Sequence, residues 1–330
     1  MNQSWKELRN FLQGKPEAEE PVSPLTVVVG AGIHGLLDPR TPEEYENTRA
    51  LVSWDCLLES FGIGSSADFG PTVAWELALL GPDRDGKADW DESAARHRDK
   101  VFRERVCQRI AEAEEVQGKI GFGDYGPLRS VLASPFVADV VSLNIDLVAE
   151  NILKAEGWKT GRAIGGKSSA DRHRVLTNPE GRSTRVWHPH GDHHRKDSLT
   201  FGLRHYQQLV NSVEKRRSKW KRAERIARKE GNATQPSELR NAYELLLTRP
   251  LLILGAGLDR SEWDLWSILV ARFRNFAKKS NEQFRPPVWR LTTDGEVRKL
   301  PDKIQSLRAP SWPKGWAWLG DLFSESTPIA

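Results

Sequence analysis

The stretch LTVVVGAGIHG, residues 25–35, decides the fold class of this chain of 330 residues. Its first half, Leu25–Val29, is a continuous apolar, β-branched run bounded by Pro24 and Gly30, which is the pattern of a strand buried on both faces. Its second half is rich in glycine, so the backbone there can approach a ligand closely. The stretch therefore predicts a buried strand that ends at a binding loop.

Four further apolar runs predict additional strands, at residues 136–143, 184–187, 250–254 and 287–291. Helical patterns lie between them, among them an amphipathic segment at 92–115. Strands that alternate with helices indicate an α/β fold with a parallel, doubly wound, Rossmann-like sheet.

The chain divides into three parts. Residues 1–23 predict a short amphipathic helix and a linker rich in Pro and Glu. Residues 24–298 form the α/β domain, with a helical insertion at about 60–130 and a basic helical segment at about 212–232. Residues 299–330, which include three tryptophans, predict an irregular Trp-rich C-terminal cap that either packs on the domain or contacts a partner.

Composition favours a cytoplasmic protein without membrane contact. No apolar run approaches the roughly 18 residues of a membrane span, and the first 20 residues are too charged for a secretory signal. Two cysteines, Cys56 and Cys107, are too few for a disulfide framework or a four-thiolate zinc module.

The basic segment stands out against a modest net charge of +4. Residues 214–230 hold nine Lys or Arg and three Glu, a local excess of six positive charges. We interpret the segment as an exposed, solvated helix face. The alternative is a surface for an acidic partner or for nucleic acid through 215–229, which is not favoured because only Trp220 interrupts the charges.

The glycine loop satisfies the spacing G-x-G-x-x-G with Gly30, Gly32 and Gly35. Such a loop can receive a pyrophosphate on its amides, or it can be an ordinary tight turn. A dehydrogenase fingerprint would open a continuous helix and then reach a strand with an acidic end. Pro39 and Pro42 interrupt any such helix, and residues 51–58 have a helical pattern. The loop therefore argues for phosphate binding but against a dehydrogenase.

Four short motifs follow one another at predicted strand ends. They are Gly30-Ala31-Gly32-Ile33, Ser142-Leu143-Asn144-Ile145-Asp146, His190-Gly191, and Leu252–Leu258 with the sequence LILGAGL. In this order the chain resembles the sirtuin-like family, particularly its bacterial NAD-hydrolysing branch found in anti-phage defence. Residues 53–58, 199–209 and 259–266 resemble further segments of that branch.

Two departures from the family pattern refine the resemblance. His34 stands where the family usually has serine or another small polar residue. The protein deacylases of the family carry a four-cysteine zinc module, which two cysteines cannot build. We therefore expect no zinc, and NAD+ hydrolysis is the better expectation than deacylation.

The resemblance implies NAD+ as substrate and assigns the site residues. The binding residues would be Gly30, Ala31, Gly32, Ile33, Asn144, Asp146, Gly255, Ala256 and Gly257. Asn144 would position a water or a ribose hydroxyl, Asp146 would bind the carboxamide or ribose hydroxyls, and His190 would act as a general base. Nicotinamide and ADP-ribose would be the products.

Other interpretations of these residues remain open. Asn or Asp after a strand is often a turn former, and a histidine beside glycine is often structural. Residues 188–194 also spell H-x-H-x-D-H, a dinuclear metallohydrolase signature, although the last histidine of the chain is His205 and the downstream ligands are missing. We therefore expect His188, His193 and His194 to be loop residues at the pocket mouth. A non-catalytic module that senses NAD+ or ADP-ribose is a further alternative.

An unregulated NAD hydrolase would kill its host. We therefore expect the chain to be quiet until a sensor partner or oligomerisation activates it, with the basic segment and the Trp-rich tail as contact surfaces.

Overall fold

The structure is a computed structural model, and it describes most of the chain. The described residues are 2–13, 24–36, 41–52, 54–62, 70–79, 92–166, 168–202, 205–208, 210–211, 214–215, 218, 241–258, 262–275, 285–296 and 301–325. All statements below concern these residues. The basic segment predicted at 212–232 lies almost entirely outside them.

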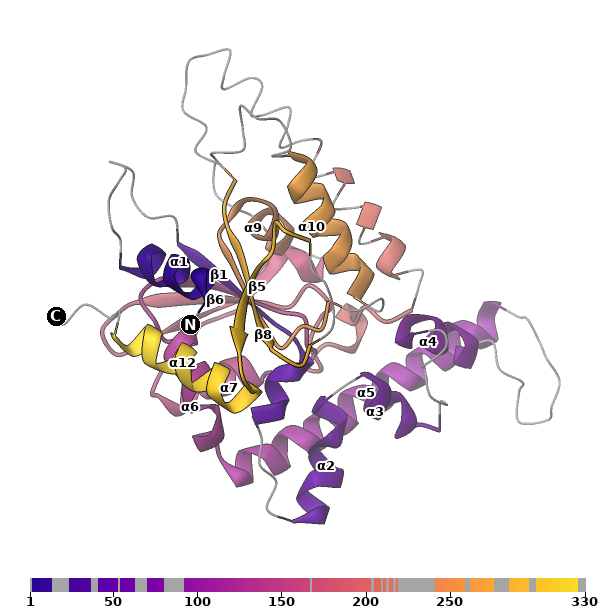
Figure 1. Ribbon diagram of the computed structural model, residues 1–330. Coiled ribbons are helices and arrows are strands. Elements are labelled where there is room, and N and C mark those ends of the chain that lie inside the picture. Colours follow the sequence, from indigo (N-terminus) through magenta and orange to yellow (C-terminus); the bar gives the residue numbers. More distant parts are fainter. Residues whose placement is uncertain are drawn as a thin grey trace.

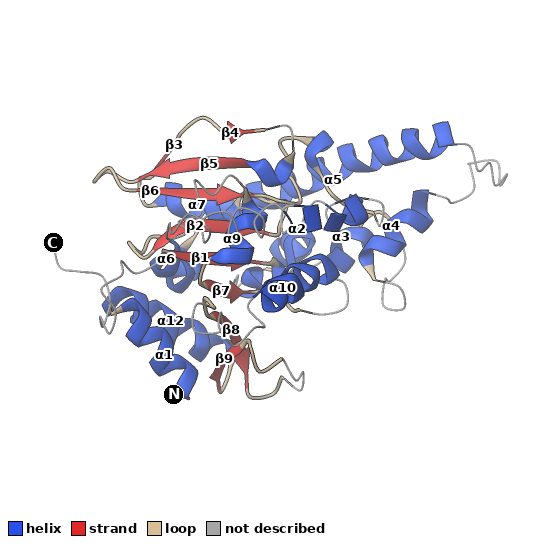
Figure 2. Cartoon of the chain, turned by 90° about the horizontal axis from the view of Figure 1, so that it is seen from above, coloured by secondary structure: helices blue, strands red, loops and turns tan. Residues whose placement is uncertain are grey.

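A nine-stranded sheet forms the centre of the described chain, in the order β3-β5-β6-β2-β1-β7-β8-β9, with β4 beside β5. Its six parallel strands are β6 (Ser183–Trp187), β2 (Val137–Ser142), β1 (Leu25–Val29), β7 (Leu251–Leu254), β8 (Val288–Thr293) and β9 (Gln305–Ala309). Figure 2 shows the strands side by side in this order. The Rossmann-like α/β prediction and its five strands are confirmed.

Three further strands extend the sheet through antiparallel pairing and were not predicted. They are β3 (Lys159–Thr160), β4 (Ile164–Gly165) and β5 (Arg172–Thr177), and β5 pairs with β6. The strand β5 is rich in Arg and His and only partly buried, so it lacks the apolar run that identifies a central strand.

Helices cover both faces of the sheet (Figure 1). On one face lie α1 (Gln3–Leu12), α6 (Gly126–Leu132), α7 (Val148–Ala155) and α12 (Trp312–Glu325), and on the other α9 (Ala242–Thr248) and α10 (Trp263–Asn275). Each face of the sheet has its own hydrophobic core, and alternate residues of β1 point into the two cores. Val27 and Val29 lie in the first core, under α1, α6, α7 and α12, and Val28 lies in the second, under α9 and α10. This double burial explains the continuous apolar run of the strand.

A third core holds the helical insertion between β1 and β2. It is built by α2 (Pro42–Val52), α3 (Trp54–Glu59), α4 (Pro71–Leu79) and the long α5 (Glu92–Ile120), which lie together beside the sheet in Figure 1. Ile145 and Phe201, from loops of the sheet domain, also belong to this core. The insertion is therefore anchored at the carboxyl edge of the sheet.

Short 3₁₀ turns lie between these elements: η1 (Ala31–Leu36), η3 (Gly123–Tyr125), η4 (Ser169–Asp171) and η5 (Lys196–Ser198). The glycine loop opens into η1 instead of a long helix, in agreement with the expectation from Pro39 and Pro42.

The C-terminal cap is regular, so the prediction of an irregular segment was wrong. Residues 305–309 form β9 and residues 312–325 form α12. Pro313 is tolerated because it lies in the first helical turn. The glycines of α12 allow close packing, since a Cβ at Gly315 would lie 3.0 Å from the side chains of Leu291 and Ala309, and one at Gly320 would lie 3.1 Å from Pro127.

The N-terminal helix closes the edge of the sheet at β9. Asn2 donates from Nδ2 to the Ser306 carbonyl at 2.8 Å, and Trp5 donates from Nε1 to the Arg308 carbonyl at 2.8 Å. These bonds satisfy carbonyls that an edge strand otherwise leaves unpaired.

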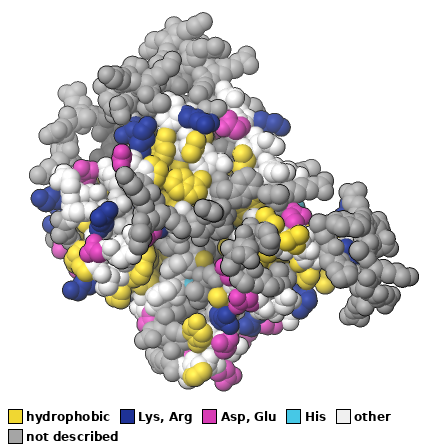
Figure 3. All heavy atoms as spheres, turned by 45° about the vertical axis from the view of Figure 1, so that its right-hand side comes forward, with side chains coloured by type: hydrophobic (Ala, Val, Ile, Leu, Met, Phe, Trp, Pro, Cys, Tyr) yellow, Lys and Arg dark blue, Asp and Glu magenta, His cyan; other side chains and the backbone are white. Residues whose placement is uncertain are grey.

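The helices of the described residues include none that is long and apolar enough to cross a membrane. On the described part of the face drawn in Figure 3, basic and acidic side chains are interspersed.

Candidate functional site

A cavity of about 200 Å³ lies where four parallel strands end. Val29 of β1 is level with Ser142 of β2 and Leu254 of β7, so the loops that follow these strands emerge side by side. The cavity is lined by Gly30 and Ala31 after β1, Leu143 and Asn144 after β2, His190 after β6, and Gly255 and Gly257 after β7. The cavity therefore lies at the carboxyl ends of the parallel strands, where an open α/β sheet commonly binds its ligand.

The two glycine loops pack directly against each other. A Cβ at Gly30 would lie 2.8 Å from the Gly255 carbonyl oxygen, and one at Gly32 would lie 2.7 Å from the same atom. Gly255 has a φ of +67°, and the Gly32 amide donates to its carbonyl at 2.8 Å. The glycines at 30, 32 and 255 are therefore required for loop packing, in addition to any close approach of a ligand.

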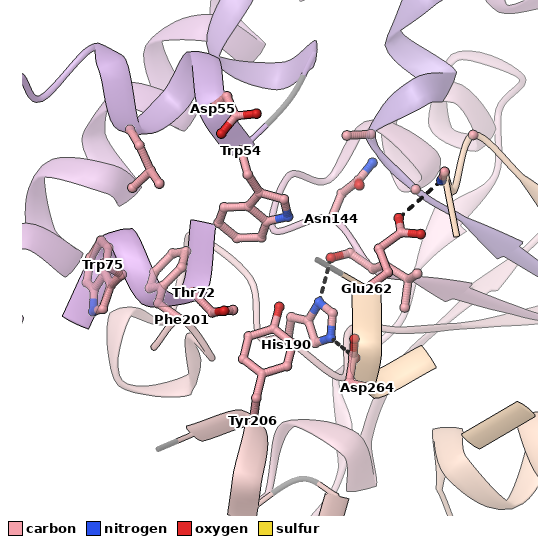
Figure 4. Close-up of a pocket in the computed structure, with 16 residues that line it drawn as sticks. Trp54, Asp55, Thr72, Trp75, Asn144, His190, Phe201, Tyr206, Glu262 and Asp264 are labelled. Carbon is pink, nitrogen blue, oxygen red and sulfur yellow. Dashed lines mark hydrogen bonds and ion pairs between the residues drawn. The ribbon is translucent and has the colours of Figure 1, made fainter. Parts of the chain in front are cut away.

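An aromatic wall contributed by the insertion and by the chain after β6 faces these loops (Figure 4). The rings of Trp75 and Phe201 are stacked with centroids 4.5 Å apart, and Trp54 meets Phe201 edge-on at 5.1 Å. Tyr206 lies beside His190 with ring centroids 5.4 Å apart. Trp75 was not identified from the sequence, because aromatic residues in helical segments are usually core residues. Phe201 and Tyr206 lie in the segment 199–209 noted above, but no role was expected for either side chain.

Asn144 occupies the junction of two cavities. A smaller cavity of about 20 Å³ adjoins the first, and Ala31, Trp54 and Asn144 line both. The Asn144 side chain is buried, and its Nδ2 lies 3.4 Å from Nε2 of His34. A ligand that spans the two cavities would pass this amide.

Asp146 lines the smaller cavity and is held by two partners. Its Oδ2 accepts from Nε2 of His34 at 3.0 Å, and its Oδ1 accepts from the Val148 amide at 3.0 Å. Although burial alone raises the pKa of this carboxyl, His34 and the amide more than offset it and lower the pKa below its usual value. Asp146 is therefore an ionised carboxylate in a buried setting.

His34 is the residue through which Asp146 is fixed. It is almost fully buried, and its Nδ1 lies 3.0 Å from the hydroxyl of Tyr125. Because the Asp146 carboxylate can only accept, Nε2 of His34 carries a proton and donates to Asp146, while the Tyr125 hydroxyl is the hydrogen-bond partner of Nδ1. His34, which stands where the family pattern has a small polar residue, thus supplies the hydrogen bond that holds Asp146.

His190 lines the main cavity, with both of its ring nitrogens bonded to acceptors (Figure 4). Nδ1 donates to the Leu143 carbonyl at 2.9 Å, and Nε2 donates to Oδ2 of Asp264 at 2.8 Å. Burial lowers the pKa of His190, but the buried Asp264 carboxylate more than offsets this and raises it above the ordinary 6.5. Asp264 is therefore the partner that sets the protonation of His190, and the sequence motifs assigned it no role.

The other histidines of the loop do not converge on one point. Nε2 of His188 donates to Glu150 at 2.9 Å, Nδ1 of His193 donates to the Ile145 carbonyl at 3.3 Å, and His194 is exposed. No group of three or more His, Cys, Asp or Glu that could hold a metal ion is present among the described residues. His188 and His193 are buried, so their expected place at the mouth of the main cavity was wrong.

Two further contacts fix the second glycine loop from opposite sides. Arg290 on β8 donates from Nε to the Ala256 carbonyl at 3.1 Å and from Nη2 to the Gly257 carbonyl at 3.0 Å. On the cavity side, Glu262 accepts from the amide of Gly257 at 3.2 Å and from the amide of Leu258. Ala256 is buried and is not among the residues that line the cavity.

Two comparisons with known proteins bear on the chain. A family model described as a SIR2-like domain matches residues 138–308, which is more than half of the 330 residues. None of the curated proteins matches the chain. The matched range contains Asn144, Asp146, His190 and the second glycine loop, whereas Gly30–Gly32 and the helical insertion precede it.

Proposed function

The chain belongs to the SIR2-like domain family, and from this premise we propose that it binds NAD+ across the carboxyl ends of its parallel strands and hydrolyses it to nicotinamide and ADP-ribose. SIR2-like domains use NAD+, and the resemblance to sirtuin-like proteins is thereby confirmed at the level of the family. The hydrolytic activity and the defence role are our proposal.

The observation that carries the proposal is the convergence of Asn144 and His190 on one cavity beside both glycine loops. The smaller adjoining cavity, at about 20 Å³, has room for about one water molecule and not for the nicotinamide ring. We therefore place the dinucleotide in the main cavity, with its nicotinamide-bearing ribose beside Asn144. The Asp146 carboxylate lies on the wall of the smaller cavity, next to this position.

The reaction replaces one bond at the anomeric carbon of this ribose. The C1′–N bond to nicotinamide breaks, and its electron pair passes to the ring nitrogen, which becomes neutral. Water forms the new C1′–O bond and loses one proton to a base. The transition state has oxocarbenium character, as in glycoside hydrolysis.

The residues of the site can assist each part of this step. The Asn144 amide can orient the water or a ribose hydroxyl, and the Asp146 carboxylate stabilises the positive charge on the ribose. His190, which is hydrogen-bonded to Asp264, can accept the proton from water when its ring is in the neutral form, after it has lost one of its two ring protons.

We further propose that this activity is that of a cytoplasmic anti-phage effector of the abortive-infection type. Continuous NAD+ hydrolysis would kill the host, so the isolated chain is quiet until a protein partner or oligomerisation activates it. On the one face drawn in Figure 3, the described basic side chains are mixed with acidic ones, so this face offers no basic patch of the kind that binds nucleic acid.

The direct test is to incubate the purified chain with NAD+, alone and with its natural partner or trigger, and to follow nicotinamide and ADP-ribose. We expect Asn144→Ala and His190→Ala each to lower the activated rate by about 100-fold or more. His194→Ala is the matched control, because His194 is exposed on the same loop and does not line the cavity.

Unchanged turnover in both variants would reject the mechanism. Tight NAD+ binding without turnover under every activating condition would instead identify a sensor of NAD+ or ADP-ribose. About two stoichiometric metal ions per chain would revive the metallohydrolase interpretation.

A further inference from the structure

The second glycine loop, residues 255–258, directs two consecutive backbone amides at Glu262, a residue that lines the cavity. Arg290 holds the carbonyls of Ala256 and Gly257 from the β8 side. Gly255 and Leu258 have positive φ angles of 67° and 51°, and Leu258 is the one residue other than glycine with a positive φ among those described. Successive backbone N–H groups in a tight turn that includes a left-handed residue can form a nest, a concave group of donors that binds anions.

The carboxylate of Glu262 occupies this nest. Its two oxygens accept from the amides of Gly257, at 3.2 Å, and of Leu258. Glu262 and Gly257 both line the main cavity, and Figure 4 shows the carboxylate beside Asn144, bonded to the loop. An internal anion thus lies at the position that a bound anion would need.

We propose that Glu262 closes the second glycine loop in the resting protein, as an internal competitor for the phosphate group of the dinucleotide that the amides of Gly257 and Leu258 would receive. The identity of the ligand rests on the proposed function. Binding of the phosphate then requires the Glu262 side chain to leave the loop, and the site opens when it does.

The competition follows from the hydrogen-bonding capacity of the groups. Ionised carboxylate and phosphate oxygens only accept, and each of the two amides has a single proton, so both anions cannot use the nest at once. The site is also negative without a ligand, because Asp55, Glu262 and Asp264 line the cavity and none of the described lining residues is Lys or Arg.

The size of the cavity agrees with a closed state. At about 200 Å³ it is smaller than the roughly 300–1,000 Å³ typical of sites for drug-sized ligands, and a dinucleotide is at least of that size. Withdrawal of Glu262 enlarges the cavity at the loop that receives the phosphate.

Glu262 could instead be a structural brace that shapes the loop. Arg290 already holds both carbonyls, and the Leu258 side chain is almost fully buried in the second core, so the loop has supports that do not involve Glu262. The two roles predict opposite changes in ligand affinity when Glu262 is removed. Removal of a brace weakens ligand binding, whereas removal of a competitor strengthens it.

The test measures binding of ADP-ribose and of inorganic pyrophosphate to the full chain by calorimetry, for the wild type, Glu262→Gln and Glu262→Ala. We expect Glu262→Ala to tighten binding of both ligands by about tenfold, and Glu262→Gln to tighten it less, because one amide oxygen remains to accept from the loop. Asp55→Asn is the matched variant, since it removes one negative charge from the same cavity but leaves the nest occupied.

Thermal unfolding without ligand establishes that each variant is folded. Weaker or equal binding in folded Glu262→Ala, or the same gain in Asp55→Asn as in Glu262→Ala, overturns the proposal. A wild type that hydrolyses NAD+ while Glu262→Ala gains no affinity rejects the competitor and retains the proposed function. Tighter binding by Glu262→Ala, in a protein that releases no nicotinamide under activation, retains the competitor and rejects the proposed function.

Discussion

At the scale of single residues, the site depends on partners that no short motif contains. His190 follows a strand and was visible in the sequence, but the Asp264 carboxylate that raises its pKa is 74 positions away. Likewise, Asp146 was a predicted binding residue, whereas His34 was noted only as a departure from the family pattern and not as the partner of Asp146. A pattern of adjacent residues identifies a group at a strand end, whereas the protonation of that group is set by contacts made in the folded chain.

The His190–Asp264 pair predicts a pH dependence of NAD+ hydrolysis. If His190 accepts a proton, the rate falls as the pH decreases through a pKa above 6.5, because Asp264 stabilises the protonated ring. Asp264→Asn removes that charge and leaves the lowering effect of burial, so this limb of the pH–rate profile moves to lower pH. Steady-state rates across the pH range would measure the shift.

A loss of rate in Asp264→Asn that is equal at every pH would mean that the carboxylate only orients the ring. Ser267→Ala, one turn further along α10, is a control for general disturbance of this helix, and its profile should keep the wild-type limb.

At the scale of elements, the strands were predictable and the C-terminal segment was not. The central strands β1 and β7 are buried on both faces, so their composition is continuous and apolar. In α12, by contrast, a composition rich in proline and tryptophan suggested irregular structure, although the segment is a helix whose Gly315 and Gly320 allow contact with β8, β9 and α6. Composition does not show whether a glycine breaks a helix or lets it pack closely.

The helix α5 joins the insertion to the loop after β2 through a buried carboxyl group. Glu114 accepts from the Leu147 amide and from Nδ2 of Asn151, and its pKa is raised to about 8 by burial first and by Asp146 second. The ordinary pKa is 4.5, so the folded protein loses stability as the pH rises from 4.5 through about 8, where the buried carboxyl must ionise.

Glu114→Gln cannot ionise and should therefore gain stability relative to the wild type as the pH rises. We expect similar melting temperatures near pH 4.5 and an advantage of a few degrees for the variant at pH 8 and above. Thermal unfolding across this range would measure it. The control is Glu112→Gln, because Glu112 is exposed on the same helix. A constant difference at all pH values would contradict a raised pKa at Glu114.

The helix α1 should stabilise the sheet without a role at the cavity. Trp5→Phe removes the bond from Nε1 to the Arg308 carbonyl of β9 and part of a buried ring, so we expect a loss of about 1–2 kcal/mol in the free energy of unfolding. Chemical denaturation would measure it. Trp312→Phe, at a tryptophan that is 43% exposed, should change stability little. A lowered affinity for ADP-ribose in folded Trp5→Phe would contradict this division of roles.

At the scale of the whole molecule, the cavity lies between two bodies with separate cores. Its floor comes from loops of the sheet, and its aromatic wall comes largely from the insertion, with Trp54 on α3 and Trp75 on α4. The glycine loops and His190 could be anticipated because they follow strands. The aromatic wall could not, because the sequence does not show how the insertion is placed against the sheet edge.

This arrangement makes the insertion a reporter of ligand binding. A dinucleotide in the cavity contacts both bodies, so its binding energy stabilises α3 and α4 against local opening as well as the loops at residues 30–31 and 143–144. Hydrogen exchange should therefore slow in residues 54–59 and 71–79 when ADP-ribose is added, while α12 on the far side of the sheet keeps its rate. In Glu262→Ala the same protection should appear at lower ligand concentration, because the phosphate no longer competes with a carboxylate. Protection confined to the sheet loops would mean that the ligand does not reach the aromatic wall, and the dinucleotide would then have to lie along the sheet edge without the insertion.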